Sequence, residues 1–155
     1  MPARSYGHYC PVAKTLELVG ERWTLLIVRE LLVGPLRFTD LHAALAGIPR
    51  NLLADRLRDL EAHDLVARRE LPPPAARTVY DLTDAGRALL PVIGALAQWG
   101  LAHLPPPEPG EVVSPTLAVL AERFGLPLSA PSGPGGRAVS PRQGRREPPE
   151  KEHEA

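Results

Sequence analysis

The sequence predicts a mainly α-helical domain that carries one small β-hairpin. Apolar residues recur at the three- and four-residue spacing of amphipathic helices through most of residues 11–104. Two short runs, at 65–70 and 78–82, flank a proline-rich turn and predict a pair of strands. Glycine and proline separate these segments, so the elements can be inferred in order.

Two helices are expected first, over residues 11–19 and 22–33. Pro11 suits the first position of a helix, where its missing N–H would have no partner, and Gly20 suits the end. The second helix is expected to end before Gly34. Its broad apolar face, expected in the core, consists of Trp23, Leu26, Ile27, Leu31 and Leu32.

A short helix and a longer one are expected on either side of the break Ala46-Gly47-Ile48-Pro49. The short helix begins at Thr39 or its neighbour, and the longer one runs from 49 to about 63. Two helices joined by such a break have the layout of a helix-turn-helix. The buried face of the longer helix follows i, i+4, i+7 spacing and is centred on Leu53, Leu57 and Leu60.

The strands, 65–70 and 78–82, enclose the turn LPPPAAR, and Thr83 is expected to cap a final helix that runs to about Leu104. Pro91 lies inside that helix and should kink it, because its ring clashes with the carbonyl four residues earlier. The complete order predicts a winged helix-turn-helix: a three-helix core, a two-stranded wing and a long C-terminal helix suited to dimerisation.

The composition divides the chain into four parts. Residues 1–9 are expected to be a flexible N-terminus, and 10–104 the winged helix-turn-helix domain. Residues 105–125 are expected to be a proline-rich linker with a short helix over 115–124. From 126 to 155 apolar residues are too few to offset the entropy of ordering, so a disordered tail is expected.

Composition also excludes several classes of function. The chain has 18 Lys and Arg against 18 Asp and Glu, so net charge alone does not indicate a nucleic-acid partner. Cys10 is the one cysteine, which excludes an internal disulfide. Neither a signal peptide nor a membrane span is recognisable, so a cytoplasmic protein is expected. The scattered histidines and the lack of an acid–base or phosphate-binding motif predict neither metal, cofactor nor enzyme activity.

The helix at 49–63 carries the pattern of a DNA-reading helix. At about 100° per residue, Asn51, Asp55 and Arg58 point away from the leucine face, with Arg50 and Ala54 beside them. Arginine can pair with guanine and asparagine with adenine in the major groove. These five residues are therefore the candidates for the recognition helix. Any amphipathic surface helix also turns polar residues outward, so solvation alone is the alternative.

Arginines also flank the turn of the predicted hairpin. Arg68, Arg69 and Arg77 could contact the phosphate backbone or the minor groove, although an ordinary solvated hairpin is the alternative. Arg56 lies nearer the leucine face than Arg58. We therefore expect Arg56 to form an internal ion pair rather than a DNA contact.

A stripe on the final helix is the candidate dimer interface, and packing on the chain's own domain is its alternative. The stripe consists of Val92, Leu96, Trp99 and His103. Cys10 is the candidate redox-sensing residue, because a helix N-terminus favours the thiolate. A small residue packed at a helix start is the plainer interpretation of Cys10.

The chain resembles the HxlR-type winged helix regulators of bacteria, which are relatives of the MarR group. The resemblance covers residues 10 to about 104 and rests on several blocks in order: Cys10-Pro11-Val12, ERWTLLIVRELL, RFTDLHAAL-x-GI, NLLADRLRDLE, LVARR and Y-x-L-T-x-x-G. It implies dimer contacts from the first and last helices and DNA reading by Arg50–Glu61. Asp64 departs from the family, which usually has glycine there.

These observations together predict a homodimeric transcriptional regulator, repressor or activator, that binds a pseudo-palindromic site in double-stranded DNA. The resemblance also implies that an oxidant or electrophile could act through Cys10, and a small-molecule effector is a further option. The main alternative is a winged-helix module that docks on a partner protein without specific DNA binding.

Overall fold

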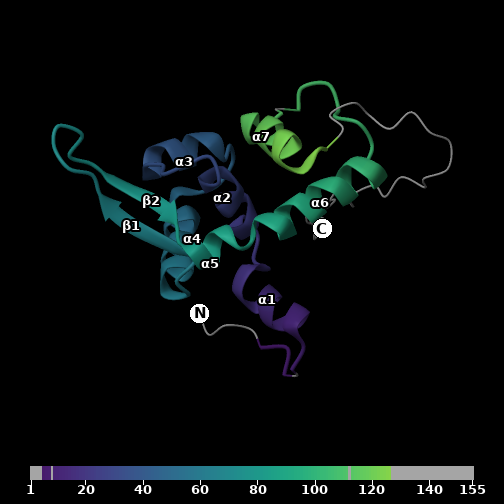
Figure 1. Cartoon of the computed structure of the whole chain (residues 1–155), viewed down its shortest axis with the longest axis horizontal. Helices are drawn as coiled ribbons and strands as arrows, with labels where there is room; N and C mark the ends of the chain where they lie inside the picture. Colours follow the sequence, from purple (N-terminus) through teal and green to yellow (C-terminus); the bar gives the residue numbers. More distant parts are fainter. Residues whose placement is uncertain (1–4, 8, 112, 127–155) are drawn as a thin grey trace, which may run out of the picture.

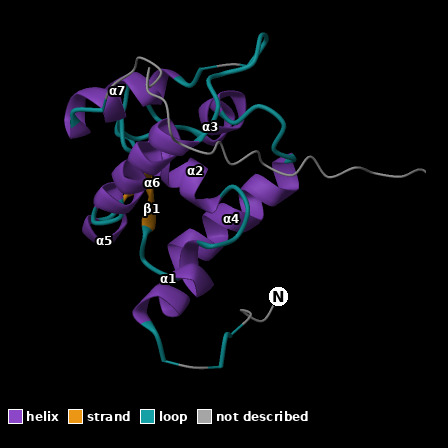
Figure 2. Ribbon diagram, turned by 90° about the vertical axis from the view of Figure 1, so that its right-hand side faces the viewer, coloured by secondary structure: helices purple, strands orange, loops and turns teal. Residues whose placement is uncertain are grey.

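The computed structural model describes residues 5–7, 9–111 and 113–126, and its elements follow the predicted order (Figures 1 and 2). They are α1 (Pro11–Val19), α2 (Thr24–Leu31), α3 (Phe38–Ala44), α4 (Arg50–Ala62), β1 (Val66–Glu70), β2 (Thr78–Leu82), α5 (Asp84–Arg87), α6 (Leu90–His103) and α7 (Pro115–Phe124). The winged helix-turn-helix fold is confirmed. In Figure 1 the hairpin extends from one side of the helices, and α6 leads away on the other.

The core lies between α2, α3, α4 and the base of the hairpin. Its fully buried side chains include Ile27, Leu31, Leu41, Leu53, Leu57, Leu60 and Leu82. The three leucines predicted on the inner face of α4 are all in this set, so the orientation of α4 is confirmed. The opposite face of α4 is therefore turned outward.

Helix α2 begins two residues later than the sequence predicts. Trp23 has a left-handed backbone (φ 78°), which a right-handed helix cannot include, and the helix starts at Thr24. The Thr24 N–H donates to the Glu21 carbonyl at 3.1 Å, so 21–24 form a turn between α1 and α2. Trp23 is nevertheless half-buried against the core, as expected.

The wing is a two-stranded antiparallel sheet in which Val66 pairs with Leu82 and Glu70 with Thr78. Leu36, just before α3, exchanges two backbone hydrogen bonds with Tyr80, at 2.8 and 3.0 Å. This bridge, which the sequence analysis did not predict, connects the wing to the start of the helix-turn-helix.

The predicted final helix is divided rather than kinked. Thr83 caps α5 as expected, its Oγ1 accepting the Gly86 N–H at 3.0 Å. The chain then turns at 88–89, and Pro91 becomes the second residue of α6. Proline is tolerated in the first turn of a helix but not in the interior, so α5 ends before the proline ring would clash.

Helix α7 is docked on the rest of the domain. Leu120, Ala121 and Leu126 belong to the same core cluster as Ile93 of α6. Residue 126, expected at the start of the tail, is therefore buried, and the remainder of that expected tail lies outside the described residues. Residues 5–7 and 9 have no regular secondary structure, while 1–4 and 8 also lie outside.

Glu30 of α2 is a buried carboxylate that connects α2 to α7. Thr116 Oγ1 donates to its Oε2 at 2.8 Å and Ser114 Oγ to its Oε1 at 3.2 Å. Arg29 also donates to Oε1, at 2.6 Å from Nη2. A buried charge needs such partners, so Glu30 makes the position of α7 specific.

No described helix has the length and hydrophobicity to cross a membrane.

Candidate DNA interface

The outward face of α4 presents four of the five predicted recognition residues to solvent. Arg50, Asn51, Asp55 and Arg58 are exposed, whereas Ala54 is half-buried. Pro49 precedes the helix and no side chain caps it. The first backbone N–H groups of α4 are therefore open to an anion such as a phosphate.

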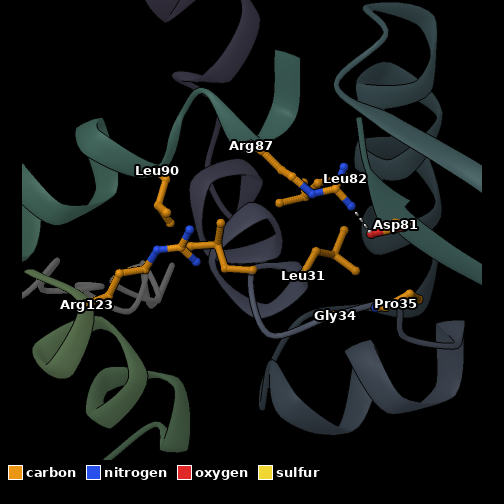
Figure 3. A pocket seen from close by; sticks show the side chains of 9 residues that line it. Leu31, Gly34, Pro35, Asp81, Leu82, Arg87, Leu90 and Arg123 are labelled. Carbon is orange, nitrogen blue, oxygen red and sulfur yellow. Dashed lines mark hydrogen bonds and ion pairs between the residues drawn. The ribbon is translucent and has the colours of Figure 1, made fainter. Parts of the chain in front are cut away.

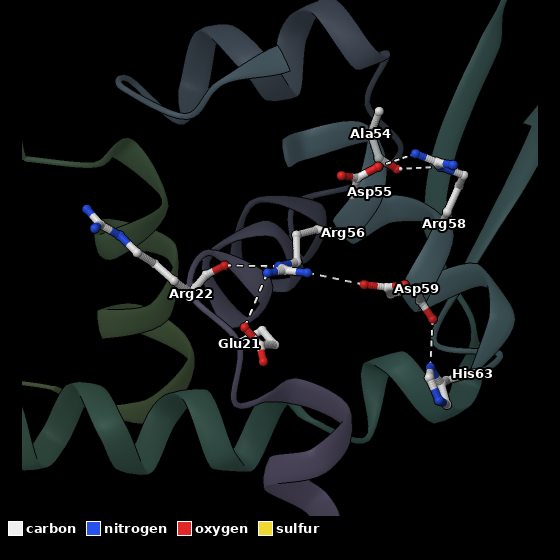
Figure 4. Close-up of polar contacts among 8 residues, drawn as sticks. All are labelled: Glu21, Arg22, Ala54, Asp55, Arg56, Arg58, Asp59 and His63. Atoms are coloured by element: carbon white, nitrogen blue, oxygen red, sulfur yellow. Dashed lines mark hydrogen bonds and ion pairs between the residues drawn. The ribbon is translucent and has the colours of Figure 1, made fainter. Parts of the chain in front are cut away.

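Arg58 and Asp55 form an ion pair along the outward face of α4 (Figure 4). The Arg58 side chain is 72% exposed and also donates from Nε to the Ala54 carbonyl at 3.5 Å. Exposed pairs of this kind contribute about 0.3–0.5 kcal/mol. Arg58 could therefore exchange Asp55 for a base edge at little cost.

Arg50 lies over the ring of Phe38, with its guanidinium carbon 5.1 Å from the ring centroid. This cation–π contact joins the N-terminus of α4 to the start of α3. The position of Arg50 beside the outward face was predicted from helical spacing, whereas its aromatic partner was not. The contact orients Arg50 beside the first turn of α4.

Arg56 makes internal contacts, as predicted. Its side chain is only 18% exposed, and it pairs with Glu21 at 3.3 Å and Asp59 at 3.2 Å. Its Nε also donates to the Arg22 carbonyl at 3.3 Å (Figure 4). Arg56 thus fixes α4 against the turn that precedes α2 and is not part of the outward face.

The three wing arginines differ in their surroundings. Arg68 is exposed and has no ion-pair partner in the part of the chain that the structure describes. Arg77 donates from Nε to the Ala75 carbonyl at 3.0 Å, which holds it at the wing tip. Arg69 pairs with Asp81 at 3.2 Å. Arg68 and Arg77 are therefore the more readily available to phosphates.

Asp81 is a contact point between the wing and α5 that the sequence analysis did not identify. Its side chain is 5% exposed, and besides Arg69 it binds Arg87 at 2.9 Å. An ion pair between strands and a later helix depends on tertiary packing, which local sequence patterns do not report.

The start of α3 carries a second exposed pair. Arg37 donates to Asp40 from Nε at 2.8 Å and from Nη2 at 2.9 Å. These hydrogen bonds, with the charges of Arg37 and Arg77, hold the pKa of Asp40 below its ordinary value.

The predicted dimer stripe on α6 is partly exposed to solvent. Val92, Leu96 and Trp99 are 41%, 53% and 50% exposed. Trp99 stacks on His103, with centroids 4.9 Å apart. The described part of the chain therefore covers this stripe only in part.

Cys10 precedes α1 and is half-buried. Its carbonyl accepts the Lys14 N–H at 2.8 Å. Elsewhere in the described residues, no cluster of three or more His, Cys, Asp or Glu side chains could hold a metal ion.

Comparison with known proteins places this geometry among transcriptional regulators. A family model described as HxlR-like helix-turn-helix matches residues 18–108. The uncharacterised HTH-type transcriptional regulator Rv3095 of Mycobacterium tuberculosis is 50% identical over 97 residues, which are 63% of this chain and 61% of Rv3095. The chain thus spans less than two thirds of that relative.

Solved structures of other regulators are similar as well. The reduced form of the transcriptional regulator YodB from Bacillus subtilis aligns with a TM-score of 0.56 and 32% identity, covering 65% of this chain and all of YodB. Another YodB structure is described as quinone-bound. The structure of PA1607 aligns with a TM-score of 0.60 and 31% identity over 89% of this chain and 87% of PA1607, well beyond the length of the family model.

Proposed function

Because the chain belongs to the HxlR-like helix-turn-helix family of DNA-binding transcriptional regulators, we propose that it acts as a homodimer on a pseudo-palindromic operator. The outward face of α4 carries this proposal. It combines exposed arginine and asparagine side chains with uncapped N–H groups at the helix start, as major-groove recognition requires.

Within this proposal Asn51 and Arg58 contact base edges, and Asp55 releases Arg58 when DNA binds. The small side chain of Ala54 allows α4 to approach the DNA closely. Arg50 and the first N–H groups of α4 contact phosphates. These roles follow from exposure and position on the helix.

The wing supplies contacts that do not depend on base sequence. Arg68 and Arg77 bind phosphates on either side of the α4 contact, and Arg69 does so when it leaves Asp81. Because phosphate contacts release counterions, the affinity falls linearly on a log–log plot against salt.

The exposed stripe on α6 supports the dimer. Val92, Leu96, Trp99 and His103 would pack on the same residues of a second copy across a two-fold axis. Such an axis places the two α4 helices in successive major grooves about 34 Å apart.

Fluorescence anisotropy with labelled DNA from upstream of the protein's own gene tests this function. A scrambled duplex of equal length and base composition is the control, and both are titrated at several salt concentrations. We expect binding at least ~10³-fold tighter to the upstream fragment.

Equal and weak binding to both duplexes would contradict the proposal for that fragment. A genome-wide selection of bound fragments then decides between a different operator and the protein-docking alternative. Enrichment of no common sequence would favour the docking module. Transcription in vitro from an enriched promoter distinguishes repression from activation.

A second candidate function, thiol-based regulation, is motivated by the half-buried Cys10 and by the similarity to YodB. With a quinone, the thiolate would add to a ring carbon and the ring would take up a proton to become a hydroquinone thioether. Mass spectrometry after benzoquinone treatment, alongside DNA binding, tests it with Cys10→Ser as the control. An adduct on Cys10 that leaves operator affinity unchanged would contradict it.

A further inference from the structure

A cavity of about 220 Å³ lies where the wing, α5, α6 and α7 meet the end of α2 (Figure 3). Its apolar walls include Leu31, Leu82 and Leu90. Two arginines and one aspartate complete the charged part of the lining. Sites for drug-sized ligands measure about 300–1,000 Å³, so a ligand of this cavity must be small.

The charged groups of the lining are not equally paired. Asp81 already accepts a hydrogen bond from Arg87 at 2.9 Å and pairs with Arg69 at 3.2 Å. Arg123 forms no ion pair with any residue that the structure describes, and in Figure 3 its side chain extends from α7 into the cavity below Leu90. Arg87 also lies 3.7 Å from Asp84, so Arg123 is the one guanidinium of the lining without a carboxylate partner among the described residues.

The docking of α7 fixes Arg123 in this position. Glu30 accepts hydrogen bonds from Ser114 and Thr116 at the start of α7. At its other end, Phe124 packs on the core beside Arg123. A guanidinium held at the mouth of a cavity with both polar and leucine walls is suited to a carboxylate, which it can bind through two parallel hydrogen bonds.

We propose that this cavity binds a small organic monocarboxylate with an aliphatic body. The carboxylate lies against Arg123 and the unused N–H groups of Arg87, and the hydrocarbon part packs on the leucines. A monoanion can pair with the Arg123 guanidinium, whereas an uncharged analogue offers it no opposite charge. The ligand would also connect α7 to the wing, since both elements contribute to the lining.

Thermal unfolding and isothermal titration calorimetry of the full chain test the site with cyclohexanecarboxylate as the probe. Cyclohexanecarboxamide, which has the same shape without the charge, is the ligand control. We expect the carboxylate to raise Tm by about 5 °C at ten times its Kd. Arg123→Gln should weaken binding at least ~10-fold, whereas Glu122→Gln, its neighbour on α7 outside the lining, should bind as the parent does.

Equal binding of the amide, or equal binding by Arg123→Gln, would overturn the assignment. Absence of any heat or Tm shift with cyclohexanecarboxylate and with shorter branched carboxylates would overturn it as well. Circular dichroism of each variant verifies folding. The measurement contains no DNA, so its failure is distinguishable from failure of the proposed operator binding.

Discussion

Asp64 adopts a left-handed backbone conformation at the joint between α4 and β1 (φ 55°). The Leu65 N–H donates to the Leu60 carbonyl at 2.9 Å, which closes the helix end around Asp64. This conformation costs most residues about 1–2 kcal/mol. Asn and Asp tolerate it better than other side chains do, and glycine adopts it without this cost. Asp64 therefore retains a strain that glycine would relieve.

We expect Asp64→Gly to raise the free energy of unfolding by about 0.5 kcal/mol, because relief of backbone strain exceeds the added entropy of the unfolded chain. Asp64→Ala should lower it by about 1 kcal/mol. Urea denaturation measures both. An alanine variant at least as stable as the parent would contradict the assignment of strain, since both substitutions remove the same carboxylate.

Arg58 and Arg77 are expected to contribute to DNA binding in different ways. Arg58→Gln removes the proposed base contact and should cost about 1–3 kcal/mol on the operator while relaxing sequence preference. Arg77→Gln removes the proposed phosphate contact, so it should weaken binding to operator and scrambled DNA alike and reduce the salt slope by about 1. Anisotropy titrations on both duplexes measure the two effects. A change in sequence preference caused by Arg77→Gln would show that the wing role is misassigned.

The burial and contacts of a residue can be predicted from the sequence where local spacing determines its environment. The inner leucines of α4 and the internal role of Arg56 follow from helical periodicity. By contrast, nothing in the sequence marks Trp23 as left-handed, since tryptophan has no preference for that conformation. The two ion-pair partners of Asp81 come from β1 and α5, so its role became apparent only in the folded chain.

At the scale of elements, the division between α5 and α6 has a tertiary cause. Gly86 lies so close to the Leu65 carbonyl that any side chain would collide with it, and Thr83 Oγ1 donates to the Asp64 carbonyl at 2.6 Å. Helix α5 is thus fixed to the base of the wing. Pro91 alone predicts a kink within one helix. Because α5 is attached to the wing, the helix instead ends at Arg87 and α6 begins at Leu90.

Two glycines of α6 distinguish packing from helix propensity. A Cβ at Gly94 would lie 2.8 Å from ring carbons of Phe124, whereas at Gly100 the nearest neighbour would be 3.4 Å away, on Leu104. Alanine favours a helix over glycine by about 0.8–1.0 kcal/mol. Alanine should therefore stabilise the protein at Gly100 and disturb the docking of α7 at Gly94.

We expect Gly100→Ala to raise the free energy of unfolding by about 0.5–1 kcal/mol. Gly94→Ala should lower it by about 1–3 kcal/mol and expose the segment 105–113 to protease, because Phe124 must move. Chemical denaturation and limited proteolysis measure both variants. Equal gains in stability at the two positions, without new cleavage, would show that α7 does not pack on α6 as described.

At the scale of the whole molecule, exposed apolar side chains gather on the two helices that flank the domain. On α1, Val12, Leu16 and Leu18 are exposed, and on α6 the predicted dimer stripe is exposed as well. In Figure 1 these helices lie apart from the outward extension of the wing. A second copy covering both helices would leave α4 and the wing of each copy open to DNA, which is how dimerisation and DNA binding can use separate surfaces.

Leu96→Glu tests this division of surfaces, and Val33→Glu is its control. Leu96 is 53% and Val33 51% exposed, but Val33 follows α2 and lies outside the stripe. A charge inside an apolar interface loses its hydration without a partner. Leu96→Glu should therefore raise the dimer Kd at least ~100-fold in sedimentation velocity. It should also reduce operator affinity to that of a single half-site, while Val33→Glu leaves both unchanged. If the Leu96→Glu protein still sediments as a dimer, the two-fold axis lies elsewhere. If it becomes monomeric and yet binds the operator with full affinity, one copy suffices for recognition.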